Sequence, residues 1–207
     1  GQLLPTTAPN SLGEYNSTLE EARADLFALY YLADNKLVEL GILPDNEAYK
    51  AEFDSYIRNG LFTQFSRVEL GKTNTEAHMQ NRKLIAEWCY EKGAANNVIE
   101  KKSRDGKTYF VVNDYEALRG LFGELLAEIQ RIKSEGDFKA GKALVEKYAI
   151  HIDYDLHKEV RERYAELQLK PYGGFVNPDI VPVEKNGKIV DYAVVPCESF
   201  LKQQLEY

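Results

Sequence analysis

Residues Thr18–Leu32 join a charged first half to an apolar second half. Apolar side chains recur along this segment at helical spacing, which predicts a helix over residues 18–33 with one buried stripe. Glu21 and Asp25 are four residues apart and therefore share a face of that helix. Charges at the head of a helix whose remainder is apolar indicate a metal site or a charge-relay site.

A second interpretation of the same residues needs no ligand. Ser17 and Glu20 have the spacing of a capping box, in which two side chains satisfy the free N–H groups at a helix start. Acidic residues in a first turn also suit the helix dipole. On spacing alone, the cap is favoured over the site.

The run from Glu20 to Asp25, E-E-A-R-A-D, resembles the E-E-x-R-A-[E/D] motif of the dipeptidyl peptidase III family. Members of that family are zinc metallopeptidases that remove dipeptides from peptide N-termini. The resemblance implies that Glu21 is a zinc ligand. It also implies that Glu20 and Asp25 orient two zinc-binding histidines, because carboxylates that hydrogen-bond a ligating imidazole fix its tautomer and direction.

A second segment, Glu76–Arg82, resembles the family's H-M-Q-x-R sequence. By this resemblance His78 helps to stabilise the transition state of the reaction, with Arg82 close by. The two residues are four apart and project from one face of a predicted helix. That face continues into Ile85 and Cys89, so without the resemblance His78 would be a partly buried histidine at the edge of a core.

The family's first motif, H-E-x-x-G-H, carries two zinc ligands and the catalytic glutamate on one helix. The histidines of this chain are His78, His151 and His157, and none is followed by glutamate. The opening residues Gly1–Pro5 resemble the segment that follows the motif in the family. We therefore expect a C-terminal fragment of a longer peptidase, inactive by itself, whose missing N-terminal part completes the Zn²⁺ site and whose substrates are short peptides.

Turn residues and apolar periodicity predict a mainly α fold, with a small β-hairpin between the helices and a C-terminal β-strand appendage. By the resemblance, the helical part is a portion of the family's zinc lobe. Residues 1–17 are expected to form a loop. Helices are predicted at residues 18–33, 47–58, 74–93, 115–134, 138–148 and 154–169, with another turn or two at 61–65. The hairpin is expected to pair residues 98–102 with 108–112, because Asp105-Gly106 is a strong turn signal.

The predicted secondary structure changes at Pro171, from helices before it to strands after it. Strands are expected after it, at residues 173–176, 179–184 and 188–195. We therefore predict two parts, a helical lobe over residues 1–170 that carries part of the zinc site and strands over residues 171–207. The family has a helical zinc lobe facing a mixed lobe built round a β-barrel, and by resemblance the C-terminal strands belong to that second lobe.

Composition narrows the possible functions. The 207 residues are 44% hydrophobic, enough for one sizeable core. The net charge of −7 argues against a nucleic-acid partner, and no apolar run approaches the ~18 residues of a membrane span. Cys89 and Cys197 follow no pairing pattern, which indicates reduced thiols and a cytoplasmic setting.

Two other classes of protein remain open. A non-enzymatic helical interaction domain would keep the same fold without the metal helix. A di-iron helical bundle around Glu20, Glu21 and Asp25 would need Glu-x-x-His pairs on two helices, and the sequence has none. His151 and His157 rank low as a metal site, because a separation of six misaligns their imidazoles on a helix.

Overall fold

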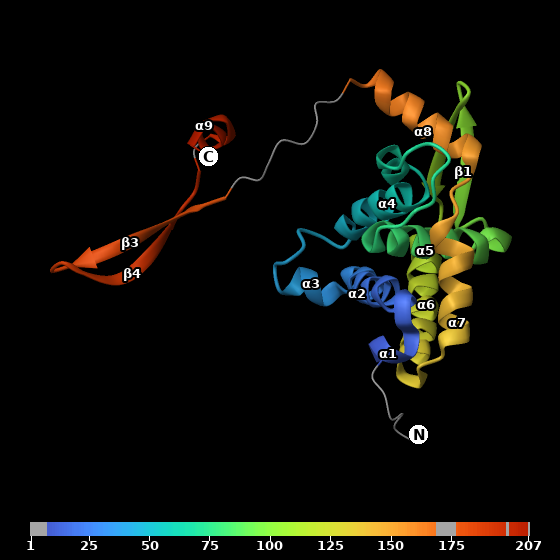
Figure 1. Cartoon of the computed structure of the whole chain (residues 1–207), viewed down its shortest axis with the longest axis horizontal. Coiled ribbons are helices and arrows are strands. Elements are labelled where there is room, and N and C mark those ends of the chain that lie inside the picture. The colour runs from blue at the N-terminus through green and yellow to red at the C-terminus, as the bar shows by residue number, and fades with distance from the viewer. Residues whose placement is uncertain (1–7, 169–176, 198, 207) are drawn as a thin grey trace. The chain divides into compact units, whose positions relative to one another are not determined.

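The computed structural model describes residues 8–168, 177–197 and 199–206 (Figure 1). The chain divides into two compact units, Gly1–Leu167 and Gln168–Tyr207. The first unit carries the site residues predicted above. The second carries the C-terminal strands.

Helices dominate the first unit, as predicted. In chain order the unit contains α1 (Ala8–Leu12), η1 (Gly13–Tyr15), α2 (Asn16–Leu32), α3 (Asn35–Glu39), α4 (Ala48–Leu61), η2 (Thr63–Arg67), α5 (Ala77–Lys92), η3 (Ala94–Asn96), β1 (Ile99–Arg104), β2 (Lys107–Val112), α6 (Tyr115–Glu135), α7 (Phe138–Val145), the π-helical turn η4 (Glu146–Ile150) and α8 (Tyr154–Glu166). Among the described helices of the chain, none has the length and apolar character that crossing a bilayer requires.

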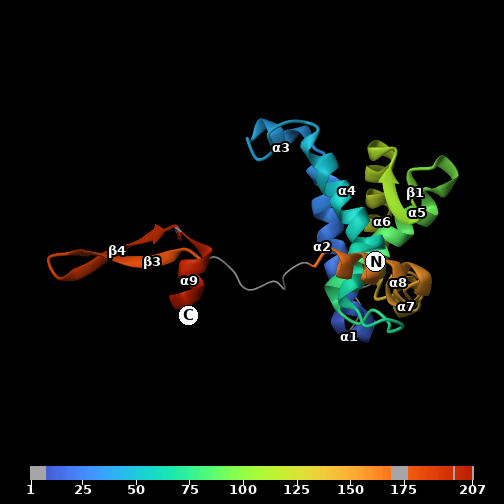
Figure 2. The same ribbon diagram turned by 90° about the horizontal axis from the view of Figure 1, so that it is seen from above.

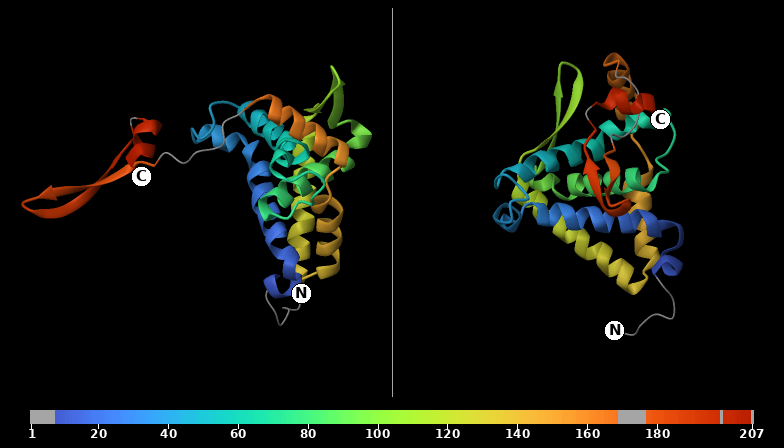
Figure 3. Two further views of the ribbon diagram at one scale, coloured as in Figure 1. Left: turned by 45° about the horizontal axis from the view of Figure 1, so that its top comes forward. Right: turned by 90° about the vertical axis from the view of Figure 1, so that its left-hand side faces the viewer.

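The core of this unit lies where α2, α4, α5 and α6 pack together (Figures 2 and 3). Each helix contributes fully buried apolar side chains, among them Leu26 from α2, Phe53 from α4, Leu84 from α5 and Phe122 from α6. Burial of one such side chain contributes about 1.5–3 kcal/mol. The apolar stripe predicted along residues 18–33 therefore does face the core.

Gly60 brings α4 close to α5. A Cβ at this position would lie 2.5 Å from the Cβ of Ala86 and would overlap the carbonyl oxygen of Arg82. Only a residue without a side chain permits this approach. The contact matters for the site, because α4 supplies Tyr56 and α5 supplies Asn81 to the same carboxylate, described below.

The prediction of a loop over residues 1–17 is wrong for residues 8–17, which the structure describes. Residues 8–15 form α1 and η1, and α2 already begins at Asn16. Tyr15 occupies the N-cap position of α2 without a side-chain cap, so Ser17 and Glu20 do not form the capping box. Packing explains the difference: Leu12 and Tyr15 are buried in the core, and the Tyr15 hydroxyl donates to Glu146 at 3.0 Å.

Other predicted boundaries shift by a few residues. The helix that carries His78 begins at Ala77, because the Glu76 side chain caps it by accepting from the backbone N–H groups of His78 and Met79. The helix predicted at residues 138–148 changes into a π-helical turn at Glu146. The short helices α3 and α9 were not predicted.

The predicted β-hairpin is confirmed. β1 and β2 pair in antiparallel fashion, with Lys101 opposite Phe110 and Lys102 opposite Tyr109. Asp105 and Gly106 form the two-residue turn with φ of 53° and 71°, as a type I′ turn requires.

The second unit contains an antiparallel ribbon, β3 (Asp179–Lys185) and β4 (Lys188–Val195), followed by α9 (Phe200–Glu206). Both strands were predicted, whereas the strand expected at residues 173–176 lies outside the described residues. Every residue of β3 and β4 is exposed, including Ile180, Tyr192 and Val194.

Candidate active site

Three polar contacts join α2 to the N-terminal part of α5. They connect Thr18 to Gln80 at 2.5 Å, Glu21 to His78 at 3.3 Å and Asp25 to Asn81 at 3.0 Å. The three α2 residues have i, i+3, i+7 spacing and so share one face. The structure therefore presents Glu21 and Asp25 on the α2 face that meets α5.

Glu21 and His78 form the solvent-accessible pair of this face. The Glu21 side chain is 36% exposed and that of His78 is 57% exposed, with Oε2 of the carboxylate facing Nδ1 of the imidazole. The Glu76 cap fixes the first turn of α5 and with it the backbone of His78. His78 is thus exposed at a helix start, not partly buried at a core edge.

Asp25 is held from the core side. Its Oδ2 accepts hydrogen bonds from the Tyr56 hydroxyl at 2.8 Å and from the Asn81 amide at 3.0 Å. Burial, and then the Asp25 charge, raise the pKa of Tyr56 well above its ordinary value, so the hydroxyl stays a donor. Both bonds end on Oδ2, so within the described residues Oδ1 keeps its capacity to accept.

Asn81 is fully buried between these groups. Its amide N–H₂ donates to Asp25, whereas its Oδ1 finds no hydrogen-bond donor among the described residues. A buried amide oxygen without a donor costs free energy. The packing of α2 against α5 therefore leaves an unpaired acceptor, Oδ1 of Asn81, beside Asp25. A hydrogen-bond donor from outside the described residues would relieve this cost.

Glu20 points away from this pair, toward α6. Its carboxylate accepts from Arg23 at 3.2 Å and lies 2.9 Å from the ammonium of Lys133, whose side chain is largely buried. The hydrogen bonds from Arg23 and then from Lys133 lower the pKa of Glu20 from 4.5 to about 2. Glu20 is therefore ionised at neutral pH, and its ion pair with Lys133 links α2 to α6.

The structure separates the predicted site residues into groups. Glu21, Asp25 and His78 lie at the α2–α5 contact, Arg82 follows His78 one turn later on α5, and Glu20 lies at α6. The sequence analysis did not find Tyr56, Asn81 or Lys133. Asn81 stands at the variable position of the H-M-Q-x-R segment, whereas no local pattern marks the other two.

The remaining histidines do not form a second site of this kind. The His157 ring is buried and lies 3.1 Å from the carbonyl oxygen of Val68, whereas His151 is exposed before α8. Across the described ranges, no group of three or more His, Cys, Asp or Glu side chains is arranged to hold a metal ion.

An accessible carboxylate–imidazole pair, beside a second carboxylate fixed by buried donors, suits cation binding or acid–base chemistry. It is carried here by a mainly helical unit. A model of peptidase family M49 matches residues 5–197, so the chain belongs to this family, the dipeptidyl peptidase III family.

Two known proteins are similar to the chain. Nudix hydrolase 3 of Arabidopsis thaliana is 32% identical over 143 residues, which are 69% of this chain and 16% of that protein. The solved structure of DPP III from Caldithrix abyssi matches with a TM-score of 0.55 at 23% identity, covering 78% of this chain and 27% of that one. The second match shows a shared fold. The chain spans less than a third of either protein.

Proposed function

We propose that this chain is the C-terminal part of a zinc-dependent exopeptidase that releases dipeptides from peptide N-termini, with Glu21 as one of the zinc ligands. The observation that carries the proposal is the accessible Glu21–His78 pair in a chain of family M49. The short coverage of both relatives supports the view that further chain completes the enzyme.

The donor chemistry at Glu21 fits zinc. Carboxylate oxygen is one of the three ligand types that Zn²⁺ takes, and a catalytic zinc site uses three protein ligands. Glu21 offers a partly exposed carboxylate, and the described residues hold no complete metal cluster around it. Glu21 would therefore serve as one ligand of three, beside two histidines from the missing N-terminal part.

Zinc held there would act as a Lewis acid that polarises the scissile carbonyl. The residues of this chain would position the groups around it. Asp25, fixed through Oδ2 by Tyr56 and Asn81, would accept the N–H of an incoming imidazole at Oδ1 and so orient that ligand. Glu20, held by Arg23 and Lys133, would orient the other histidine ligand.

His78 would donate a hydrogen bond to the oxygen that becomes negative in the transition state, where such donors are most effective. Because Nδ1 faces the Glu21 carboxylate, Nε2 is the ring nitrogen that would donate to this oxygen. Arg82, one turn along the same helix, would add positive charge nearby. His78 and Arg82 are thus the catalytic candidates of this chain.

The 207 residues alone would not hydrolyse peptides. One carboxylate out of three ligands is too few to hold zinc tightly, and no His-Glu-x-x-x-His is present to supply the general base. The C-terminal ribbon supports the same view. Apolar side chains are exposed on both of its faces, and an isolated two-stranded hairpin is marginal in water. We therefore assign residues 171–207 to a second lobe and residues 1–170 to the helical zinc lobe.

The proposal includes short peptides as substrates and a cytoplasmic setting without nucleic-acid or membrane partners. Two free thiols, Cys89 and Cys197, support the reducing compartment, and the net charge of −7 is opposite to that of a nucleic-acid surface. A non-enzymatic helical interaction domain is the alternative. It predicts no zinc dependence in the protein encoded by the whole reading frame.

The test compares the whole reading frame with the 207-residue chain. Each purified protein is incubated with a short peptide bearing a free N-terminus and with its N-acetylated form, and products are read by mass spectrometry alongside zinc content. We expect dipeptide release and bound zinc from the whole protein only, both lost in Glu21→Ala and retained in Glu39→Ala, whose carboxylate pairs with Lys36 on the surface. Chelator-sensitive release by the 207-residue chain would contradict the fragment assignment, and a zinc-free whole protein would favour the interaction domain.

A further inference from the structure

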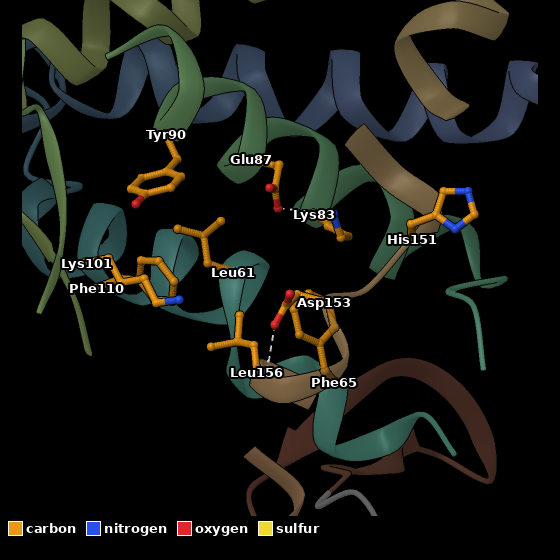
Figure 4. A pocket seen from close by; sticks show the side chains of 10 residues that line it. All are labelled: Leu61, Phe65, Lys83, Glu87, Tyr90, Lys101, Phe110, His151, Asp153 and Leu156. Atoms are coloured by element: carbon orange, nitrogen blue, oxygen red, sulfur yellow. Dashed lines mark hydrogen bonds and ion pairs between the residues drawn. The ribbon is translucent and has the colours of Figure 1, made fainter. Parts of the chain in front are cut away.

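A cavity lies on another face of α5, away from the contact with α2. Lys83, Glu87 and Tyr90 follow i, i+4, i+7 spacing, and they line a cavity of about 230 Å³ to which neither Glu21 nor His78 contributes. The other walls come from the end of α4, η2, the β1–β2 hairpin and the start of α8. Figure 4 shows Lys83, Glu87 and Tyr90 on one side of the cavity and Phe65, Asp153 and Leu156 on the other.

The ammonium of Lys83 is the buried charge of this cavity. The residue is only 4% exposed, and its Nζ donates to Oε2 of Glu87 and to the carbonyl oxygen of Tyr148, both at 3.1 Å. An ammonium has three N–H donors, so these contacts leave one for an acceptor inside the cavity. A largely buried ammonium favours an acceptor for its third N–H, because an unmet donor on a buried charge is costly.

The charges on the walls balance. Lys83 and Lys101 supply two positive charges, and Glu87 and Asp153 supply two negative charges. One oxygen of Asp153 caps α8 by accepting from Leu156 N–H, and this bond ends on Oδ1. A ligand that carries one charge of each sign would thus meet a partner for each, whereas a simple anion would also meet the two carboxylates.

The remaining wall is apolar. The rings of Tyr90 and Phe110 meet edge to face with centroids 5.7 Å apart, and Leu61 and Phe65 add buried apolar surface. The volume is below the ~300–1,000 Å³ of cavities that hold drug-sized ligands. The cavity therefore suits a small molecule with one apolar side chain.

We propose that this cavity binds a free α-amino acid with an aromatic or branched apolar side chain. The carboxylate lies at Lys83 and Lys101, the ammonium at Glu87 and Asp153, and the side chain against Tyr90 and Phe110. The site is separate from the α2–α5 contact and does not depend on the proposed peptidase activity.

The experiment is a titration of the ¹⁵N-labelled 207-residue chain, followed by backbone amide NMR shifts, with L-phenylalanine as the probe. Two analogues each lack one charge: 3-phenylpropanoate has no ammonium and phenethylamine has no carboxylate. We expect L-phenylalanine to shift amides of α5, the hairpin and the segment before α8. Each analogue should bind about tenfold more weakly or worse, because it loses a hydrogen-bonded charge contact.

Two lysines of β1 provide matched variants. Lys101 lies opposite Phe110 and faces the cavity, whereas Lys102 lies opposite Tyr109 on the other face of the hairpin. Lys101→Met should weaken L-phenylalanine binding about threefold or more, and Lys102→Met should leave it unchanged. These exposed positions keep the test independent of Lys83→Met, which removes a buried charge and risks unfolding.

Three results would each overturn the proposal. Absence of shifts at the cavity residues would exclude the site. Equal binding of L-phenylalanine and either analogue would exclude the recognition of both charges. Equal weakening by the two lysine variants would show that binding does not occur in this cavity.

Discussion

The contact between α4 and α5 at Gly60 leads to the sharpest prediction of stability. Replacement of a helical glycine by alanine at an open position stabilises a helix by about 1 kcal/mol. At Gly60 the new Cβ would meet the carbonyl of Arg82 and the Cβ of Ala86. Neither obstacle is the flexible tip of a side chain, so the two helices must move apart.

The steric overlap destabilises the protein and the higher helix propensity of alanine stabilises it. Their magnitudes decide the sign of the change in the free energy of unfolding. Overpacking of this kind costs about 1–3 kcal/mol, and the helix propensity returns at most about 1 kcal/mol. The difference is about 0–2 kcal/mol, and because one of the two overlaps is with a backbone carbonyl, we expect Gly60→Ala to lower the free energy of unfolding by about 1–2 kcal/mol, the upper part of that range. In a chain of this size, that lowers Tm by about 2–8 °C.

The measurement is urea denaturation and thermal unfolding followed by circular dichroism, with Gly120→Ala as the matched control. Gly120 lies in α6, and a Cβ there meets no atom within 4 Å, so this variant should gain about 0.5–1 kcal/mol. A Gly60→Ala protein as stable as Gly120→Ala would refute the close approach of α4 and α5. It would also mean that the packing at Gly60 is not what brings Tyr56 and Asn81 to the Asp25 carboxylate.

Three further predictions concern single side chains. Tyr56→Phe removes the hydroxyl that donates to Asp25 and should cost about 1.5 kcal/mol in urea unfolding; an unchanged midpoint would mean that this hydrogen bond adds no stability. The pKa of Glu20 is lowered from 4.5 to about 2, so its ion pairs stabilise the fold above pH 4.5 and this contribution is lost as the pH falls toward 2. Because the side chain is nearly half exposed, Glu20→Gln should cost about 1 kcal/mol at neutral pH and nothing near pH 2, and a constant difference across a pH series of thermal melts would contradict this. Burial raises the pKa of the Cys89 thiol well above its ordinary value, so a thiol reagent followed by mass spectrometry should label Cys197 in the folded protein and Cys89 only after denaturation; equal labelling rates would count against the buried position.

Local chemistry explains which elements could be predicted. The hairpin follows from Asp105-Gly106, because both residues adopt the positive φ that a type I′ turn needs. The prediction of an N-terminal loop failed because the structure there depends on packing against distant residues. Residues 8–15 have few local helix signals, and the burial of Leu12 and Tyr15 against the rest of the unit holds them in helical turns.

In the candidate site, too, local spacing could be predicted and contacts between distant residues could not. The spacing of Glu21 and Asp25 was sufficient to predict a shared helix face, and the motif resemblance singled out His78. The donors that hold Asp25 were not predictable, because Tyr56 and Asn81 lie 31 and 56 residues away along the chain. The role expected of Glu20, orienting a zinc-binding histidine, stays a prediction, and its ion pair with Lys133 of α6 could not be predicted from the sequence.

By itself, the sequence determined the helical periodicity, the turn chemistry and the motif that identifies the family, since each depends on residues a few positions apart. Only the tertiary structure decided which faces meet. It brought Glu21 against His78, buried Asn81 behind Asp25 and enclosed the Lys83 cavity. These contacts depend on how closely helices pack, and that distance is decided by residues such as Gly60 acting together with partners remote in the chain.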